Sequence, residues 1–185
     1  MVSFVANLLA ILSILALVAA VALLVYWLVR RRGSGLGGST ADGTADRAWL
    51  WPAWIVAATA MGGSLFFSEI AHFVPCQLCW YQRIGMYPLV FLLAIAGWRS
   101  ERGIRPYVLT LSVIGAAISV YHVFVQRIPG LPSGSCSLDA PCTAIYVEVF
   151  GFVTIPFMAF SAFALIIALM LAGPMLAGRT SADPS

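Results

Sequence analysis

The chain has 185 residues, of which 62% are hydrophobic and only 9% are charged, and all ten of its basic residues are arginine. Soluble domains are about half apolar and about a quarter charged, so a soluble globule of this size could not bury so much apolar surface. The net charge of +3 is too small and too scattered to indicate a nucleic-acid-binding protein. The composition therefore predicts an integral membrane protein.

The first apolar block, Val2–Val29, carries no charge and is followed by three consecutive arginines. It is far longer than the 7–15 apolar residues of a signal peptide and has no positive region before it, so it predicts an uncleaved membrane anchor. A Gly/Ser-rich stretch follows, which is typical of a flexible linker. We assign residues 1–32 to an accessory N-terminal transmembrane helix and residues 33–47 to a flexible cytoplasmic linker.

Four further apolar blocks follow with short connections: Ala48–Ser68, Cys76–Trp98, Pro106–Gln126 and Val149–Gly178. Each is long enough to cross a hydrocarbon core of about 30 Å, which takes about 20 helical residues. The fold class is therefore predicted as an all-α integral membrane protein, a four-helix transmembrane bundle (residues 48–178) with an additional N-terminal transmembrane helix. Residues 179–185 are assigned to a cytoplasmic tail.

The arginines orient these spans, because cytoplasmic loops carry an excess of positive charge. Eight of the ten fall in loops that alternating spans place on one side: Arg30, Arg31, Arg32, Arg47, Arg99, Arg102, Arg105 and Arg179. The N-terminus is then outside and the C-terminus cytoplasmic. All four cysteines are predicted to lie outside the cytoplasm, where disulfides form and persist.

The first cysteine pair, Cys76 and Cys79, is a C-x-x-C that follows Pro75 at the start of a predicted helix. Proline is favourable at a helix start, and the helix dipole there lowers a thiol pKa and favours the reactive thiolate. Helical spacing predicts that Cys76, Cys79, Arg83 and Tyr87 share one face. An arginine inside a membrane span is costly, so Arg83 is a candidate for stabilising a thiolate or a bound oxidant.

The second pair, Cys136 and Cys142, lies in an irregular, Pro/Gly-rich loop, where a small disulfide would be accessible to a soluble partner. Two dithiols near one membrane face indicate electron transfer between them. Two alternatives remain open: both pairs could be static disulfides that staple the loops, or the four cysteines could bind zinc. A non-catalytic scaffold or transporter subunit would fit the first alternative.

The stretches Phe67–Ile70 and His72–Pro88, which contain the C-x-x-C, resemble the disulfide bond formation protein B (DsbB) family, and most closely its shorter BdbC-type branch. Pro141-Cys142 and the later run Phe150–Phe157 are similar to the same branch. The likeness covers residues 48–172 and leaves the first helix outside. A vitamin K epoxide reductase-like protein is the closest enzymatic alternative, but its C-x-x-C usually comes late in the bundle.

The resemblance implies a quinone-dependent protein thiol–disulfide oxidoreductase of the bacterial cell membrane, which supports disulfide bond formation in exported proteins. Its partner would be a thioredoxin-like thiol oxidase of the DsbA/BdbD type, and its electron acceptor ubiquinone or menaquinone. By position, Cys136 would form the mixed disulfide with the partner, and Cys142 would then attack the C-x-x-C at Cys76. Cys79 would lie nearest the quinone, with Arg83 in contact with it.

Other polar residues lie near the outer face. His122 and Gln126 share a face of the fourth span, and Glu69 and His72 precede the C-x-x-C. Quinone reduction consumes two protons, so a histidine near the site could relay them. We therefore include His122 among the residues expected at the quinone. A purely structural role, with hydrogen bonds to loop backbone, is the alternative for each of these residues.

Overall fold

The computed structural model describes residues 1–33, 43–99, 102–128, 130–131, 136 and 140–180, and most of them are helical. Five long helices follow in chain order: α1 Val2–Gly33, α2 Gly43–Leu65, α3 Gln77–Arg99, α4 Arg105–Arg127 and α5 Ile155–Thr180. Of the predicted linker (33–47), residues 34–42 lie outside the described residues, whereas residue 33 ends α1 and residues 43–47 begin α2, so the linker is shorter than predicted. Of the predicted tail (179–185), residues 179–180 end α5 and residues 181–185 lie outside the described residues. Short elements connect the helices: a π-helical turn η1 Phe66–Ile70, a 3₁₀ turn η2 Arg102–Ile104, and strands β1 Glu148–Val149 and β2 Val153–Thr154.

All five helices are long and apolar enough to cross a membrane. Large apolar side chains cover their outer faces; Phe4, Trp98 and Phe91, for example, are more than half exposed. Such side chains would be costly in water and are stable against lipid. The predicted fold class, an all-α multi-pass membrane bundle with an extra N-terminal helix, is confirmed.

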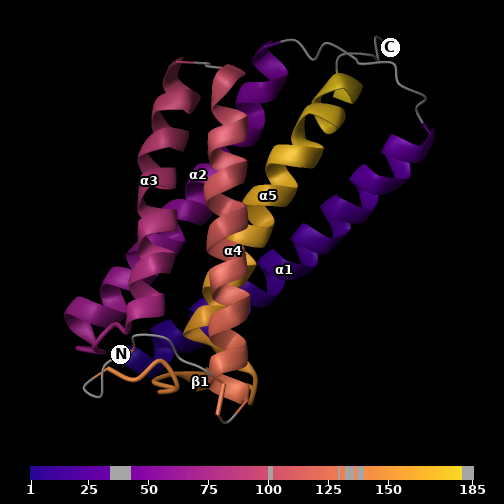
Figure 1. Cartoon of the computed structure of the whole chain (residues 1–185). Helices are drawn as coiled ribbons and strands as arrows, with labels where there is room; N and C mark the ends of the chain where they lie inside the picture. Colours follow the sequence, from indigo (N-terminus) through magenta and orange to yellow (C-terminus); the bar gives the residue numbers. More distant parts are fainter. Residues whose placement is uncertain (34–42, 100–101, 129, 132–135, 137–139, 181–185) are drawn as a thin grey trace.

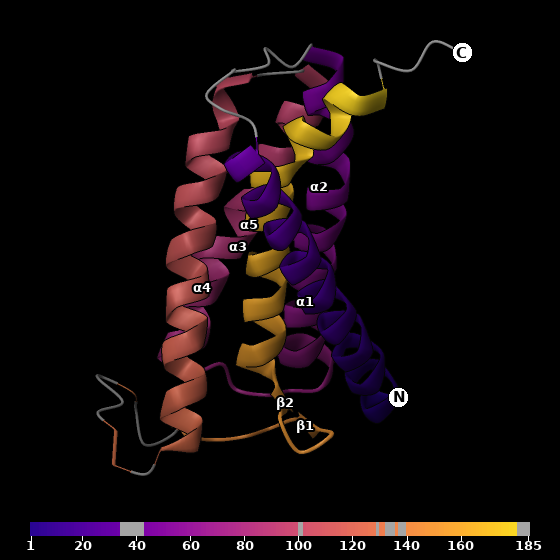
Figure 2. The ribbon, with the colours of Figure 1, turned by 90° about the vertical axis from the view of Figure 1, so that its right-hand side faces the viewer.

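Helix α5 is the centre of the bundle, and α1, α2 and α4 pack around it (Figures 1 and 2). Its side chains Phe163 and Ile166 are fully buried together with Leu89 and Leu93 of α3. The N-terminal helix α1 lies beside α5 in both views, and a row of small residues on it is buried: Ala6, Ala10, Ser13 and Ala20. Small side chains allow membrane helices to approach closely.

The last predicted span begins later than expected. Residues 148–154, which include the start of the uncharged block Val149–Gly178, form an antiparallel hairpin of β1 and β2 instead of helix. Phe150 and Gly151 turn the hairpin with positive φ angles of 56° and 76°. Pro156 then lies in the first turn of α5, where its missing N–H costs no hydrogen bond. The absence of charge marked an apolar segment but not where the helix begins.

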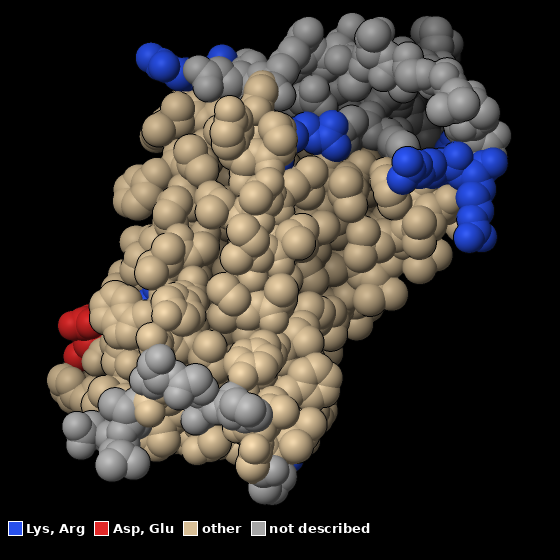
Figure 3. Space-filling model, in the orientation of Figure 1, with Lys and Arg blue, Asp and Glu red and all other residues tan. Residues whose placement is uncertain are grey.

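The two ends of the bundle differ in charge. The N-terminus and the hairpin lie at one end and the end of α5 at the other (Figures 1 and 2). On the face that Figure 3 shows, most of the basic side chains gather at the C-terminal end, and the acidic ones lie toward the hairpin end. The arginines at the C-terminal end include Arg30, Arg31 and Arg32, which close α1. Both cysteine pairs belong to the opposite, hairpin end.

Gly115 of α4 is where α4 and α5 approach closely. A Cβ atom added there would lie 2.3 Å from the ring of Phe163, which is fully buried. We expect Gly115→Ala to lower the free energy of unfolding by about 1–3 kcal/mol, because a packed core cannot absorb the extra methyl group. Thermal unfolding in detergent checks this. The control is Gly62→Ala, where the added methyl meets nothing within 4 Å; equal effects of the two variants would contradict the account.

Candidate active site

The first cysteine pair sits at the start of α3. Cys76 lies just before the first helical residue, its carbonyl oxygen accepts a hydrogen bond from the Trp80 N–H, and its Sγ accepts one from the Cys79 N–H. Cys76 is therefore the N-cap of α3, with its side chain satisfying an N–H that the helix leaves free. The prediction that the pair sits at a helix start is confirmed, but the helix begins two residues after Pro75 rather than at it.

The two thiols lie close together, with their Sγ atoms 3.0 Å apart. Hydrogen bonds from Cys79, which has the larger effect, and from His122 together lower the pKa of Cys76 to about 4, although burial acts in the opposite direction. Cys76 is therefore ionised at neutral pH when the pair is reduced. Thiolate is the form that attacks and leaves in disulfide exchange.

This pKa makes a direct prediction. We expect the absorbance of the Cys76 thiolate in the reduced protein to persist as the pH falls, and to disappear only near pH 4. In Cys79→Ala the largest stabilising hydrogen bond is gone, so the midpoint should rise toward the ordinary thiol value of 9.0. Ultraviolet titration measures both. An unchanged midpoint in Cys79→Ala would show that Cys79 does not stabilise the thiolate.

His122 of α4 connects the two cysteine pairs. Its Nε2 lies 3.6 Å from Cys76 Sγ and 3.1 Å from the carbonyl oxygen of Cys142. Its Nδ1 lies 3.3 Å from Nε2 of Gln82, a buried residue of α3. Because the Gln82 amide donates to Nδ1, the imidazole carries its proton on Nε2 and donates it toward Cys76 and Cys142. The sequence pointed to His122 as a residue at the quinone, but His122 lies between the cysteine pairs and does not line the pocket that Cys79 and Arg83 border. Gln82 was not anticipated, because its contact with His122 joins two separate helices.

The second pair is a disulfide, Cys136–Cys142, with its Cα atoms 5.9 Å apart. Cys142 is fully buried and Cys136 is half-buried, so a partner can reach the disulfide at the Cys136 sulfur but not at the Cys142 sulfur. The expectation of an accessible disulfide therefore holds for one of its two sulfurs. Cys142 and Cys76 belong to one buried cluster, against which Cys79 and Cys136 pack. The structure brings the two predicted pairs together.

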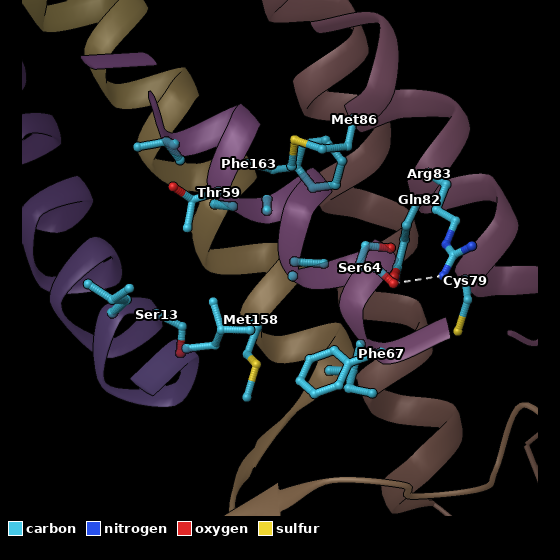
Figure 4. Close-up of a pocket in the computed structure, with 18 of the residues that line it drawn as sticks. Ser13, Thr59, Ser64, Phe67, Cys79, Gln82, Arg83, Met86, Met158 and Phe163 are labelled. Carbon is cyan, nitrogen blue, oxygen red and sulfur yellow. Dashed lines mark hydrogen bonds between the residues drawn. The ribbon is translucent and has the colours of Figure 1, made fainter. Parts of the chain in front are cut away.

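Cys79 and Arg83 border a pocket of about 450 Å³ that extends between α1, α2, α3 and α5 (Figure 4). Its lining is mostly apolar, with a few polar groups from α2 and α3: Thr59, Ser64, Gln82, Arg83 and Tyr87. Volume, apolar walls and a small polar cluster are typical of a site for a small apolar molecule with a polar head. Sequence reasoning missed Thr59 and Ser64, because a lone hydroxyl in an apolar span carries no signal of its own.

Arg83 is held at the edge of this pocket. Its guanidinium donates to the carbonyl oxygen of Ser64 across 3.0 Å and lies 5.4 Å from the centre of the Trp80 ring. Cys79, Arg83 and Tyr87 all line the pocket, so the predicted shared face is correct for these three. It is wrong for Cys76, which precedes the helix and is directed at His122 instead. Cys76 of the C-x-x-C thus faces His122 and the second cysteine pair, and Cys79 borders the pocket.

The remaining predicted polar residues do not join this site. Gln126 donates to the carbonyl oxygen of Ala144 across 3.1 Å, which is a hydrogen bond to loop backbone. His72 and Glu69 are exposed, and neither lines the pocket. His72 has a positive φ of 56° in the turn that leads from η1 to Pro75. His72 therefore lies in a turn and not at the pocket.

One group of described side chains has the geometry of a metal site. Cys76, Cys79 and His122 offer two sulfurs and a nitrogen within 4.8 Å of one another. The four-cysteine zinc site considered from the sequence is not formed in this structure, because Cys136 and Cys142 are bonded to each other. The same three side chains also fit thiol chemistry, because Cys76 can be held as a thiolate at the helix N-terminus and His122 can donate a hydrogen bond to it.

Comparison with known proteins gives a consistent result. Residues 46–173 match the family model described as disulfide bond formation protein DsbB. The chain is 51% identical over 124 residues to disulfide bond formation protein C of Bacillus subtilis, covering 66% of this chain and 89% of that protein. It is 49% identical over 114 residues to a probable disulfide formation protein C of Halalkalibacterium halodurans, covering 61% and 83%. No solved structure gave a significant match.

Proposed function

Because the chain belongs to the DsbB family, it is a membrane thiol–disulfide oxidoreductase of disulfide bond formation, and we propose that it reoxidises an extracytoplasmic thioredoxin-like thiol oxidase with a membrane quinone as electron acceptor. The electrons pass through Cys136–Cys142 and then through Cys76–Cys79. This assignment leaves no reason to prefer a vitamin K epoxide reductase-like protein or a structural scaffold.

One observation carries the proposal: the C-x-x-C faces both a second cysteine pair and an apolar pocket. Cys76 lies in the buried cluster with Cys142, and Cys79 borders the pocket beside Arg83. A pair that only stapled a loop would need neither neighbour. A pair that passes electrons from thiols to a lipid-soluble acceptor needs both.

Electrons enter at the half-buried sulfur. A partner thiolate attacks Cys136 and forms a mixed disulfide, and the Cys136–Cys142 bond breaks with Cys142 leaving as thiolate. The second partner thiol then displaces Cys136, so the partner leaves oxidised and the pair remains as a dithiol. Cys142 is too buried to be attacked first. The order of exchange proposed from the family therefore agrees with the exposure of the two sulfurs.

Transfer inward runs past His122. The Cys142 thiolate attacks Cys76 in the oxidised C-x-x-C and Cys79 leaves as thiolate; Cys136 then displaces Cys76 and reforms the Cys136–Cys142 disulfide. The Nε2–H of His122, within 3.6 Å of Cys76 Sγ, stabilises negative charge on the sulfur and is placed to move a proton. The C-x-x-C now holds two electrons as a dithiol.

The end of the pocket that Cys79 and Arg83 line is polar and fits the ring of a quinone. A bound quinone supplies an acceptor for two electrons and two protons. Cys79 lines the pocket beside Arg83, and Arg83 provides a permanent positive charge and N–H donors for a carbonyl oxygen in a low-dielectric setting. As the two electrons leave, the Cys76–Cys79 disulfide reforms.

The orientation in the membrane is part of the proposal. With the arginine-rich end in the cytoplasm, the N-terminus and the hairpin end lie outside, and both cysteine pairs face the compartment where disulfides are made. Most of the basic side chains on the face that Figure 3 shows lie at the end opposite the hairpin, which supports this orientation.

Thiol trapping tests the proposed entry step. In Cys142→Ala, Cys136 is a free thiol that can attack the disulfide of an oxidised thioredoxin-like protein, and the internal thiol that would release the partner is gone. We therefore expect a covalent complex on a non-reducing gel. Cys136→Ala is the matched control and should trap none, because Cys142 is buried. Static stapling disulfides would give no complex in either variant, and a complex formed equally by both would contradict the assigned order.

A further inference from the structure

We propose that α1 forms one wall of the quinone site and holds the isoprenoid tail of the quinone. This inference rests on the proposed function and goes beyond it, because α1 lies outside residues 46–173, the part of the chain that matches the family. The helix then contributes to binding in addition to anchoring the chain.

The pocket runs across the bundle from α3 to α1. In Figure 4, Cys79 and Arg83 lie at one side on α3, and Ser13 lies on α1 at the other, with Thr59 and Met158 between them. One face of α1 lines it: Leu9, Leu12, Ser13, Leu15, Ala16 and Ala19. From residue 9 to residue 19 a helix rises about 15 Å, which is about half the hydrocarbon thickness.

The α1 wall is apolar and close to α2. Ser13 uses its hydroxyl within the helix, donating to the carbonyl oxygen of Ala10 across 2.8 Å, so it offers no polar group to the pocket. A Cβ atom on Gly63 of α2 would come within 2.9 Å of Leu9 Cδ1, so the two helices meet at the pocket edge. Ala16 and Ala19 are small, which leaves room beside them.

The chemistry of the two ends identifies the occupant. The α3 end has a thiol and a guanidinium for a polar ring, and the α1 end has only aliphatic groups and a helix-satisfied hydroxyl. A membrane quinone has a polar ring that matches the α3 end of the pocket and an attached aliphatic tail that matches the α1 end. The isoprenoid tail gains little free energy when it moves from lipid to an apolar protein surface. The α1 wall therefore acts by packing closely against the tail and by fixing the direction in which the quinone ring enters the pocket.

Binding measurements test this with two quinones that share a ring: a menaquinone with a four-unit tail, and menadione, which has none. Quenching of intrinsic tryptophan fluorescence gives Kd for each. We expect Ala16→Phe to raise Kd for the tailed quinone about tenfold, about 1.4 kcal/mol, and to leave Kd for menadione within about twofold. The control is Val18→Phe on the opposite, 63% exposed face of α1, which should change neither.

A second measurement needs no substitution. A quinone with a photoreactive group in its tail should label peptides of the unmodified protein that contain residues 9–19, and an excess of the tailed quinone should suppress the label. Label that is absent from α1, or that phospholipid removes as well as quinone does, would overturn the inference and make the groove a lipid site.

The outcomes separate the two proposals. If the unmodified protein binds both quinones and Ala16→Phe weakens neither, or weakens both equally, α1 does not hold the tail and the proposed function stands. If the unmodified protein binds neither quinone, the quinone site itself is wrong and this inference is overturned with it.

Discussion

Cys79→Ala is expected to abolish catalytic turnover, with a rate at least about a thousandfold below that of the unmodified protein, which corresponds to about 4 kcal/mol. Cys79 is the sulfur of the C-x-x-C that borders the pocket, so without it no disulfide can form with Cys76 and no electrons can leave. The measurement is the quinone-dependent oxidation of a reduced thioredoxin-like protein.

The same variant should still react once. Its Cys136–Cys142 disulfide is intact, so each molecule should oxidise one partner and then stop, with no quinol formed. Cys136→Ala should behave in the opposite way: it should oxidise no partner, while its C-x-x-C is still oxidised by quinone. Multiple turnovers in either variant would rule out a relay through both pairs.

Arg83→Ala is expected to lower kcat/KM for quinone by about 10- to 100-fold, while exchange between the two cysteine pairs continues at its normal rate. The guanidinium is a permanent charge at the pocket edge, held by Ser64 and Trp80, and its removal takes away donors that a weakly solvated site cannot replace. Quinol formation at varied quinone concentration measures this ratio. Arg83→Lys should recover part of the loss, because it restores charge without the planar set of donors.

The matched control is Arg127→Ala. Arg127 is an arginine of the same end of the bundle, but it is paired with Glu148 across 2.9 Å at the surface and does not line the pocket. Its removal should leave quinone kinetics unchanged within about twofold, because exposed ion pairs contribute little. If the two arginine variants lost the same activity, the effect would be one of net charge and Arg83 would have no place in the site.

The membrane helices could be predicted from the sequence because charge is excluded from lipid. The uncharged block Pro106–Gln126 matched α4 to within one residue at each end, whereas α2 begins five residues before the predicted block Ala48–Ser68. Boundaries set by backbone conformation could not be predicted in this way. The hairpin at Phe150–Gly151 is as uncharged as the helix that follows it, and only its positive φ angles show that the chain turns there.

The candidate site was predictable where it depends on local spacing. Cys79 and Arg83 are one helical turn apart, and the pocket confirms that they share a face. Cys76 breaks the same rule because a cap residue does not have helical geometry. Contacts between distant helices, such as Gln82 with His122 and Leu9 with Gly63, depend on how helices pack, and a single sequence carries no record of that packing.

The central claim, that two cysteine pairs connect partner thiols to a quinone, is tested most directly by reconstitution of the full chain in liposomes. A reduced thioredoxin-like protein and quinone are added, and quinol and partner disulfide are measured in the same sample. The account predicts one quinol for each partner disulfide over many turnovers. Partner oxidation without an equal amount of quinol, or no oxidation of the partner when quinone is present, would contradict it.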